Sequence, residues 1–120
     1  MFQEVDPIKY LDVAREIAST AKPEAERTAA DRAYYAAFLF SRDQLRDKGY
    51  ITPYYNALDH KYVAQALKKH LSFRGNEEHR LRVQRNNVTY DTRFVQDPSL
   101  DWMFDTAEKI IESVKQLPHN

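Results

Sequence analysis

One short stretch of the chain carries most of the residues that could bind an anion. Residues 82–93 contain three arginines, a pair of asparagines, two threonines and a tyrosine. Arginine offers a planar fork that matches phosphate oxygens, asparagine both donates and accepts, and tyrosine adds a hydroxyl and a ring face for stacking on a base. Such side chains are suited to gripping an RNA backbone. The candidate residues are Arg82, Arg85, Asn86, Thr89, Tyr90 and Arg93.

The spacing of these residues places them on one side of a helix. Residues four apart share a helix face, so Arg82, Asn86 and Tyr90 form one stripe. Arg85 and Thr89 form the adjacent row. The same spacing also suits a structural role, in which the arginines pair with acidic helices from the two ends of the chain. Spacing alone leaves both interpretations open.

The distribution of charge agrees with a basic centre. The chain has 120 residues, with 18 Lys and Arg and 18 Asp and Glu, so its formal net charge is zero. Residues 32–96 hold twelve basic and six acidic side chains, a net charge of +6, whereas residues 1–31 and 97–120 each carry −3. A basic centre can attract an anionic polymer even in a neutral protein. The alternative is that these charges simply lie on solvated helix faces.

The elements that position these residues are predicted to be helices. Asp6 and Pro7 can cap and start a first helix, and Pro23 closes it. The second helix is expected from about Pro23 to Lys48, with Gly49 as the residue after its end. Both segments have apolar residues at helical spacing, and the second is rich in alanine between aromatic residues.

Three more helices are predicted in the second half of the chain. Asn56 can cap the third, and a break at Phe73–Asn76, whose last residue can act as a cap, precedes the fourth. Asp97-Pro98 repeats the cap-plus-proline start for the fifth, which Pro118 ends. The fourth helix is poor in apolar residues, so we expect it to face a cleft or a partner, or to be a solvated outer helix. The predicted fold is all-α, an antiparallel up-and-down helical bundle of about five helices in one domain, residues 1–120.

Composition excludes several kinds of chemistry. The chain has no cysteine, which rules out disulfides, thiolate metal sites and cysteine nucleophiles. No two of its four histidines are spaced as ligands on one helix turn, and no nucleotide-binding fingerprint occurs, so neither a metal nor a cofactor is predicted. The sequence shows no signal peptide and no apolar run long enough for a membrane span. We therefore expect a cytoplasmic protein without a membrane partner.

Three stretches of the chain together resemble HEPN-domain proteins, which are small prokaryotic helical bundles that include many RNase toxins. Residues 31–38 (DRAYYAAF) resemble the signature second helix of that family, and residues 60–67 (HKYVAQAL) resemble the helix that follows. Residues 81–91 (LRVQRNNVTYD) resemble its motif region, an arginine usually followed by a polar residue, with a histidine a few residues on. The resemblance covers residues 26–93 directly, and the outer helices fit the bundle.

The resemblance implies a metal-independent endoribonuclease that works as a homodimer, with the motif helices of two copies lining a shared cleft. In that mechanism the ribose 2′-hydroxyl attacks the adjacent phosphate. Carried over to this chain, Arg85 would stabilise the anionic phosphorane and Asn86 would orient the phosphate or the ribose. Arg82, Thr89 and Arg93 would bind RNA.

The sequence departs from the family pattern where the histidine should stand. Tyr90 occupies that window, and a free tyrosine has a pKa near 10, which makes it a poor base at neutral pH. Tyr90 can still bind phosphate or give a proton to the leaving oxygen. His79 lies six residues before Arg85, where the partner subunit could bring it close. Whether the chain is an enzyme is therefore left open.

Arg32 and the aromatic residues around it are further candidates. Arg32 stands beside an apolar stretch and needs a partner, which Glu26 or Asp31 could provide, so it is a possible cleft member and RNA contact. Aromatic residues at helical spacing are more often core or dimer interface than a stacking platform. One of the two adjacent tyrosines could send its hydroxyl toward the arginines. The aromatic residues in question are Tyr34, Tyr35, Phe38, Trp102 and Phe104.

Two functions follow from these observations. The first is an RNase toxin of a toxin–antitoxin pair that uses Arg85, Asn86 and Tyr90. The second is a non-catalytic HEPN module that binds RNA, a nucleotide or a nucleotidyltransferase-type antitoxin, for which Tyr90 is the candidate adenylylation site. An Arg85 locked against acidic neighbours, with no cavity beside it, would count against both and would leave an inert bundle.

Overall fold

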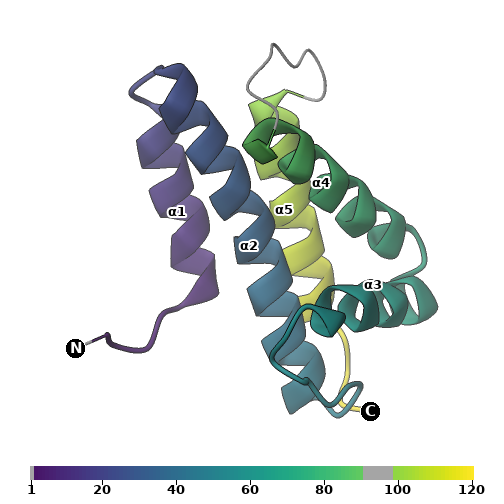
Figure 1. Ribbon diagram of the computed structural model, residues 1–120. Helices are drawn as coiled ribbons and strands as arrows, with labels where there is room; N and C mark the ends of the chain where they lie inside the picture. The colour runs from purple at the N-terminus through teal and green to yellow at the C-terminus, as the bar shows by residue number, and fades with distance from the viewer. Residues whose placement is uncertain (1, 91–98) are drawn as a thin grey trace.

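The computed structural model folds into five α-helices and describes residues 2–90 and 99–120 (Figure 1). Four helices run along the bundle in alternating directions, and the third lies crosswise near the C-terminal end of the second (Figure 1). No strand occurs in this part of the chain. The predicted all-α up-and-down bundle is thus confirmed. The helices are α1 (Pro7–Ala18), α2 (Pro23–Asp47), α3 (Leu58–Leu71), α4 (Phe73–Tyr90) and α5 (Leu100–Lys115).

The first two helices begin and end where the sequence signals place them. The Asp6 side chain accepts a hydrogen bond from the Ile8 backbone N–H at 3.0 Å, and Pro7 occupies the first turn, where its missing N–H costs nothing. Pro23 starts α2 in the same way. Gly49 follows the end of α2 with a φ of +86°, a conformation that glycine adopts without steric cost.

The connection between α3 and α4 differs from the prediction. The expected break at Phe73–Asn76 is wrong, because α4 already begins at Phe73 and only Ser72 lies between the two helices. Gly75 is a helical residue, and a Cβ added to it would lie 2.5 Å from the Lys68 backbone nitrogen. Glycine is therefore required here by the close approach of α3 to α4, and not by a loop.

Helix α5 begins after a serine cap. Ser99 is the N-cap residue, and its side chain accepts a hydrogen bond from the Trp102 backbone N–H at 3.2 Å. The helix begins at Leu100. The predicted Asp97-Pro98 start lies outside the described residues.

Lys48 fastens the end of α2 to the end of α5. Its Nζ donates to the backbone carbonyls of Val114, Lys115 and Leu117 at 3.0, 2.9 and 2.7 Å. These carbonyls lie at and beyond the last turn of α5, where no further turn supplies partners for them. The positive charge also stands at the negative end of the helix dipole, which is the favourable arrangement.

The core is built around α2, which packs against the other four helices. The small side chains on its buried face let the neighbouring helices approach closely. The prediction that the aromatic residues belong to the core is confirmed for Tyr34, Phe38 and Phe104, which are buried. Five alanines line the buried face of α2, namely Ala29, Ala30, Ala33, Ala36 and Ala37.

Among the described residues, no helix combines the length and the apolar character that a membrane span requires.

Candidate functional site

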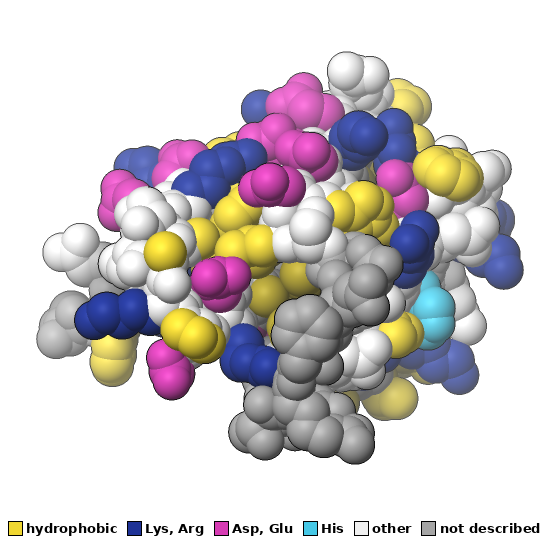
Figure 2. Space-filling view, turned by 90° about the horizontal axis from the view of Figure 1, so that it is seen from above, with side chains coloured by type: hydrophobic (Ala, Val, Ile, Leu, Met, Phe, Trp, Pro, Cys, Tyr) yellow, Lys and Arg dark blue, Asp and Glu magenta, His cyan; other side chains and the backbone are white. Residues whose placement is uncertain are grey.

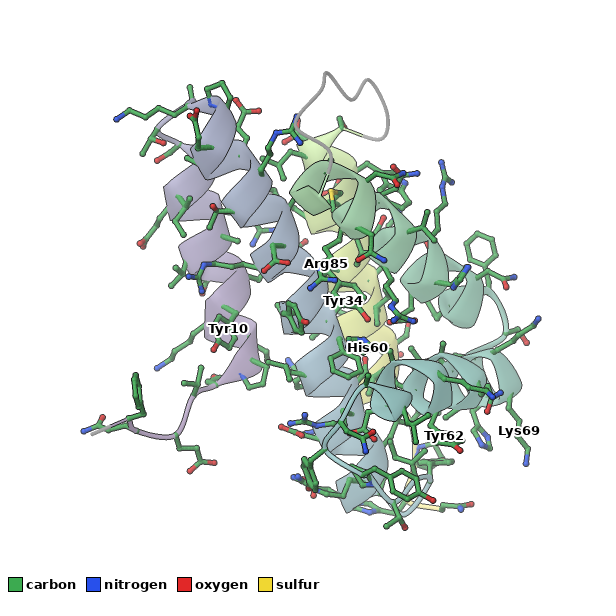
Figure 3. The ribbon with its side chains drawn as sticks, viewed as in Figure 1. Tyr10, Tyr34, His60, Tyr62, Lys69 and Arg85 are labelled. Atoms are coloured by element: carbon green, nitrogen blue, oxygen red, sulfur yellow. The ribbon has the colours of Figure 1, made fainter. Side chains whose placement is uncertain are left out.

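Arg85 lies at the centre of a polar cluster between α2 and α4 (Figure 3). Its Nε donates to Asp31 Oδ1 at 2.7 Å, and one terminal nitrogen donates to the Tyr35 hydroxyl at 3.0 Å. The other terminal nitrogen donates to Asn86 Oδ1 at 2.7 Å. Only 11% of the Arg85 side chain is exposed. The guanidinium is therefore held in one orientation by partners on two helices.

Two aromatic faces complete the surroundings of Arg85. Its Cζ lies 4.8 Å from the centre of the Tyr35 ring and 5.5 Å from that of Tyr34, within the range of a cation–π interaction. Because Asp31 also pairs with Arg85, the structural role left open by the sequence is realised for this arginine. The lock against an acidic neighbour, one of the two conditions that would count against a functional site, is thus present.

Tyr34 connects this cluster to α3 through His60. The Tyr34 hydroxyl and His60 Nδ1 lie 2.5 Å apart. The imidazole also stacks on Phe38, with ring centres 4.1 Å apart. Burial lowers the pKa of His60 to about 4, and the nearby positive charges of Arg82 and Arg85 act in the same direction. His60 is therefore neutral at neutral pH.

Glu78 is a carboxyl group fully buried beneath the same tyrosine. Neither of its oxygens makes a hydrogen bond of normal geometry within the described part of the chain. Burial raises the pKa of Glu78 to about 7, although the neighbouring Tyr34 hydroxyl and the Arg82 charge lower it in part. Arg82 Nε is likewise buried without a partner. Buried polar groups without partners are rare in folded proteins and cluster at functional sites.

The Tyr34 hydroxyl lies between His60 and Glu78. Burial raises the pKa of Tyr34, the Glu78 charge raises it further, and the Arg82 and Arg85 charges oppose the shift. The hydroxyl therefore keeps its proton at all ordinary pH values. It can donate that proton to one neighbour while it accepts from the other.

The structure brings together part of the predicted site. Arg85 and Asn86 lie side by side and are joined by a hydrogen bond, and Arg82 lies one turn earlier on α4. Thr89 and Tyr90 are the last two residues of α4, and their side chains lie outside the described part of the structure. Arg93 lies outside the described residues altogether.

The expected partners of Arg32 are wrong. Asp31 pairs with Arg85 instead, and Glu26 is exposed. Arg32 Nε is buried and has no hydrogen-bond partner among the described residues. One adjacent tyrosine does send its hydroxyl to the arginines, as expected, and it is Tyr35.

Sequence reasoning missed four members of the site, Arg27, His60, Glu78 and the pairing role of Asp31. Arg27 of α2 donates to the Val88 carbonyl near the end of α4 at 2.5 Å. Glu78 stands four residues before Arg82, a spacing that can indicate one helix face. His60 had no comparable signal, because its contacts with Tyr34 join residues 26 positions apart.

On the face seen from above, basic and acidic side chains are mixed and do not form separate basic and acidic regions. On that face, acidic and basic side chains alternate around small hydrophobic patches (Figure 2). The basic centre of the sequence therefore does not by itself create a basic face there. Within the described residues, no group of three His, Asp or Glu side chains is arranged to hold a metal ion.

Comparisons of the chain with protein-family models, curated proteins and solved structures found no match. A function for this chain therefore rests on the geometry of the Arg85 cluster and on the residues of the sequence.

Proposed function

We propose that this chain is a HEPN-like, metal-independent endoribonuclease that acts in the cytoplasm as a homodimer and as the toxin of a toxin–antitoxin pair. The observation that carries the proposal is the convergence of Arg85 and Asn86 with Tyr34, Tyr35 and His60 at the junction of three helices. One small region there contains the Arg85 guanidinium, which is a fork-like donor for phosphate, the Asn86 amide and the His60 imidazole. Groups of these kinds can stabilise the developing charge and transfer the proton in phosphodiester cleavage.

The proposed reaction uses the substrate's own nucleophile. The ribose 2′-hydroxyl attacks the adjacent phosphorus, the bond to the 5′-oxygen breaks, and the products are a 2′,3′-cyclic phosphate and a 5′-hydroxyl. Arg85 stabilises the extra negative charge of the phosphorane, and Asn86 orients the phosphate. Arg82 adds a second positive charge on the same helix. No metal ion takes part in these steps.

Digestion of RNA in the presence of EDTA tests this proposal. We expect wild-type protein to leave cyclic phosphate ends, and Arg85→Ala to lose about 10²-fold or more of the cleavage rate, as for other groups that stabilise a transition-state charge. Arg80→Ala is the matched control, because Arg80 is exposed on the same helix and lies over the Trp102 ring, at 4.7 Å. Undiminished cleavage by a folded Arg85→Ala variant would remove the proposal.

The Arg85–Asp31 ion pair favours a second candidate, a non-catalytic HEPN module. An arginine already neutralised by a carboxylate and only 11% exposed is well suited to holding α4 on α2. This candidate binds RNA or a nucleotide, or pairs with a nucleotidyltransferase-type antitoxin. It predicts RNA binding that weakens with salt and proceeds without turnover. Incubation with ATP and such a partner would add the mass of an adenylyl group at Tyr90.

A further inference from the structure

We propose that His60 is the catalytic base of this site, with Tyr34 as the residue that positions it. The proposal rests on the proposed ribonuclease function and names the group that accepts the 2′-hydroxyl proton. It places that group on α3, although the sequence offers no histidine beside Arg85 on α4.

The His60 ring is fixed by contacts on several sides. Nδ1 is bound to the Tyr34 hydroxyl at 2.5 Å, and the ring stacks on Phe38 at 4.1 Å. The Tyr35 ring meets it edge-on, with ring centres 6.2 Å apart. Nε2 makes no hydrogen bond to the described residues, and this nitrogen is not fully buried. The second nitrogen of an otherwise anchored imidazole is therefore open to a ligand.

His60 and Arg85 border the same pair of tyrosines. The centre of the Tyr35 ring lies 4.8 Å from Arg85 Cζ and 6.2 Å from the centre of the imidazole. Figure 3 shows Arg85, Tyr34 and His60 following one another along α2. The same two tyrosine rings thus connect Arg85, where a phosphate would bind, with His60.

The surrounding groups favour the form of His60 that accepts a proton. Burial keeps the imidazole neutral, the charges of Arg82 and Arg85 on α4 act in the same direction, and Asp59 on α3 acts in the opposite direction. The tyrosines of α2 are uncharged. The Tyr34 hydroxyl can accept from Nδ1–H of His60, and in that tautomer the lone pair is on Nε2.

His60 Nε2 takes the proton from the ribose 2′-hydroxyl while the bond between O2′ and phosphorus forms. The bond between phosphorus and O5′ breaks, and the departing oxygen receives a proton from water. The imidazolium then returns its proton to solvent. Tyr34 keeps its own proton throughout and only holds the ring.

The first test compares His60→Gln with His70→Gln in the EDTA-containing RNA assay. His70 is exposed on the same helix, α3, so its replacement serves as the matched control. We expect kcat to fall about 10²-fold or more for His60→Gln, with KM little changed, and the control to cleave like wild type. The acid limb of the wild-type pH profile should disappear in His60→Gln, which a merely structural role would not cause.

The second test asks whether an added base restores the reaction. His60→Ala leaves space for imidazole, and we expect added imidazole to raise its cleavage rate at least tenfold, but to leave Arg85→Ala unchanged. Tyr34→Phe keeps the ring but removes the hydroxyl, so it should lower kcat while the protein stays folded.

The outcomes of these tests distinguish failure of the His60 proposal from failure of the ribonuclease proposal. Loss of cleavage in Arg85→Ala with full cleavage in His60→Gln overturns the role of His60 and leaves the ribonuclease standing. A His60→Ala variant that is folded, inactive and not rescued by imidazole also overturns it. If wild-type protein cleaves no RNA, both proposals fall together.

Discussion

Asp31 and Arg85 are 54 residues apart in the sequence, yet Asp31 Oδ1 lies 2.7 Å from Arg85 Nε and joins α2 to α4. Arginine and carboxylate in this geometry make a charge-assisted hydrogen bond, the stronger kind in proteins. The pair also determines which way the guanidinium fork faces, because Nε is the atom that Asp31 occupies. One contact thus contributes both to the stability of the bundle and to the orientation of its principal candidate site residue.

Replacement of Asp31 by asparagine should lower stability. The variant removes the carboxylate charge that faces Arg85 Nε, and we expect the free energy of unfolding to fall by about 1–2 kcal/mol, below the cost for a fully buried pair. Urea denaturation measures the loss. Asp12→Asn is the control, because Asp12 is 70% exposed and meets Arg15 only at 3.9 Å. An equal effect of the two substitutions would contradict the structural importance of the Asp31 pair.

Glu78 should make the protein less stable as the pH rises. Its pKa is about 7 in the folded chain against an ordinary value of 4.5, so the folded state holds the proton more tightly than the unfolded state. The stability that Glu78 contributes is complete below pH 4.5 and falls as the pH rises from 4.5 to 7. The total loss is roughly 3 kcal/mol.

The Glu78→Gln variant tests this dependence. Its free energy of unfolding, measured against that of wild type, should improve steadily from pH 5 to pH 8, because the amide carries no charge at any of these values. Glu16→Gln, at an exposed position of α1, should show no such trend. A constant difference between Glu78→Gln and wild type would show that Glu78 keeps an ordinary pKa.

The His60 imidazole should titrate well below an ordinary histidine. Its pKa of about 4 arises first from burial and then from the charges of Arg82 and Arg85. Proton NMR of the ring hydrogens should give a midpoint near that value. In Arg82→Gln the midpoint should rise, since one of the two positive charges is removed. A wild-type midpoint at or above 6.5 would contradict the arrangement described for this ring.

Gly75→Ala should destabilise the protein although alanine is the better helix former. Alanine gains about 1 kcal/mol of helix propensity over glycine, but its Cβ would lie 2.5 Å from the Lys68 backbone nitrogen. Helix α4 must then move away from α3, and we expect a net loss of about 1–3 kcal/mol in thermal or urea unfolding. Asn76→Ala, at the next and exposed position, should be neutral or stabilising.

The helices could be predicted because their signals are local. Asp6 and Pro7 start α1 by capping, and Gly49 follows α2 because of its backbone conformation. Each of these effects depends only on residues nearby in the sequence. The glycine at 75 was misread as part of a break because its function depends on Lys68 of another helix. A single sequence does not distinguish a glycine that bends the chain from one that admits a neighbouring backbone.

The site could be predicted only in part for the same reason. Helical spacing places the Arg85 row of α4 next to the stripe that contains Asn86, so the sequence predicts that these two residues lie together. The partners of Arg85 come from α2, and His60 comes from α3, and no periodicity encodes which helices will meet. The sequence indicates that Asp31 could form an ion pair, but its neighbour Arg32 is the partner that the sequence suggests, whereas the structure pairs Asp31 with Arg85.

The three carbonyl contacts of Lys48 have a consequence for its chemical reactivity. Because the three hydrogens of this ammonium group are directed to carbonyl oxygens, an acylating reagent reaches the nitrogen only after those hydrogen bonds break. Lys48 should thus be labelled slowly, whereas the exposed amines of Lys61 and Lys69 react at once. Acylation of Lys48, once it occurred, would remove the charge that joins the two helix ends and would leave the hydrogen bonds of Tyr50 and Asn120 to hold the residues after α5.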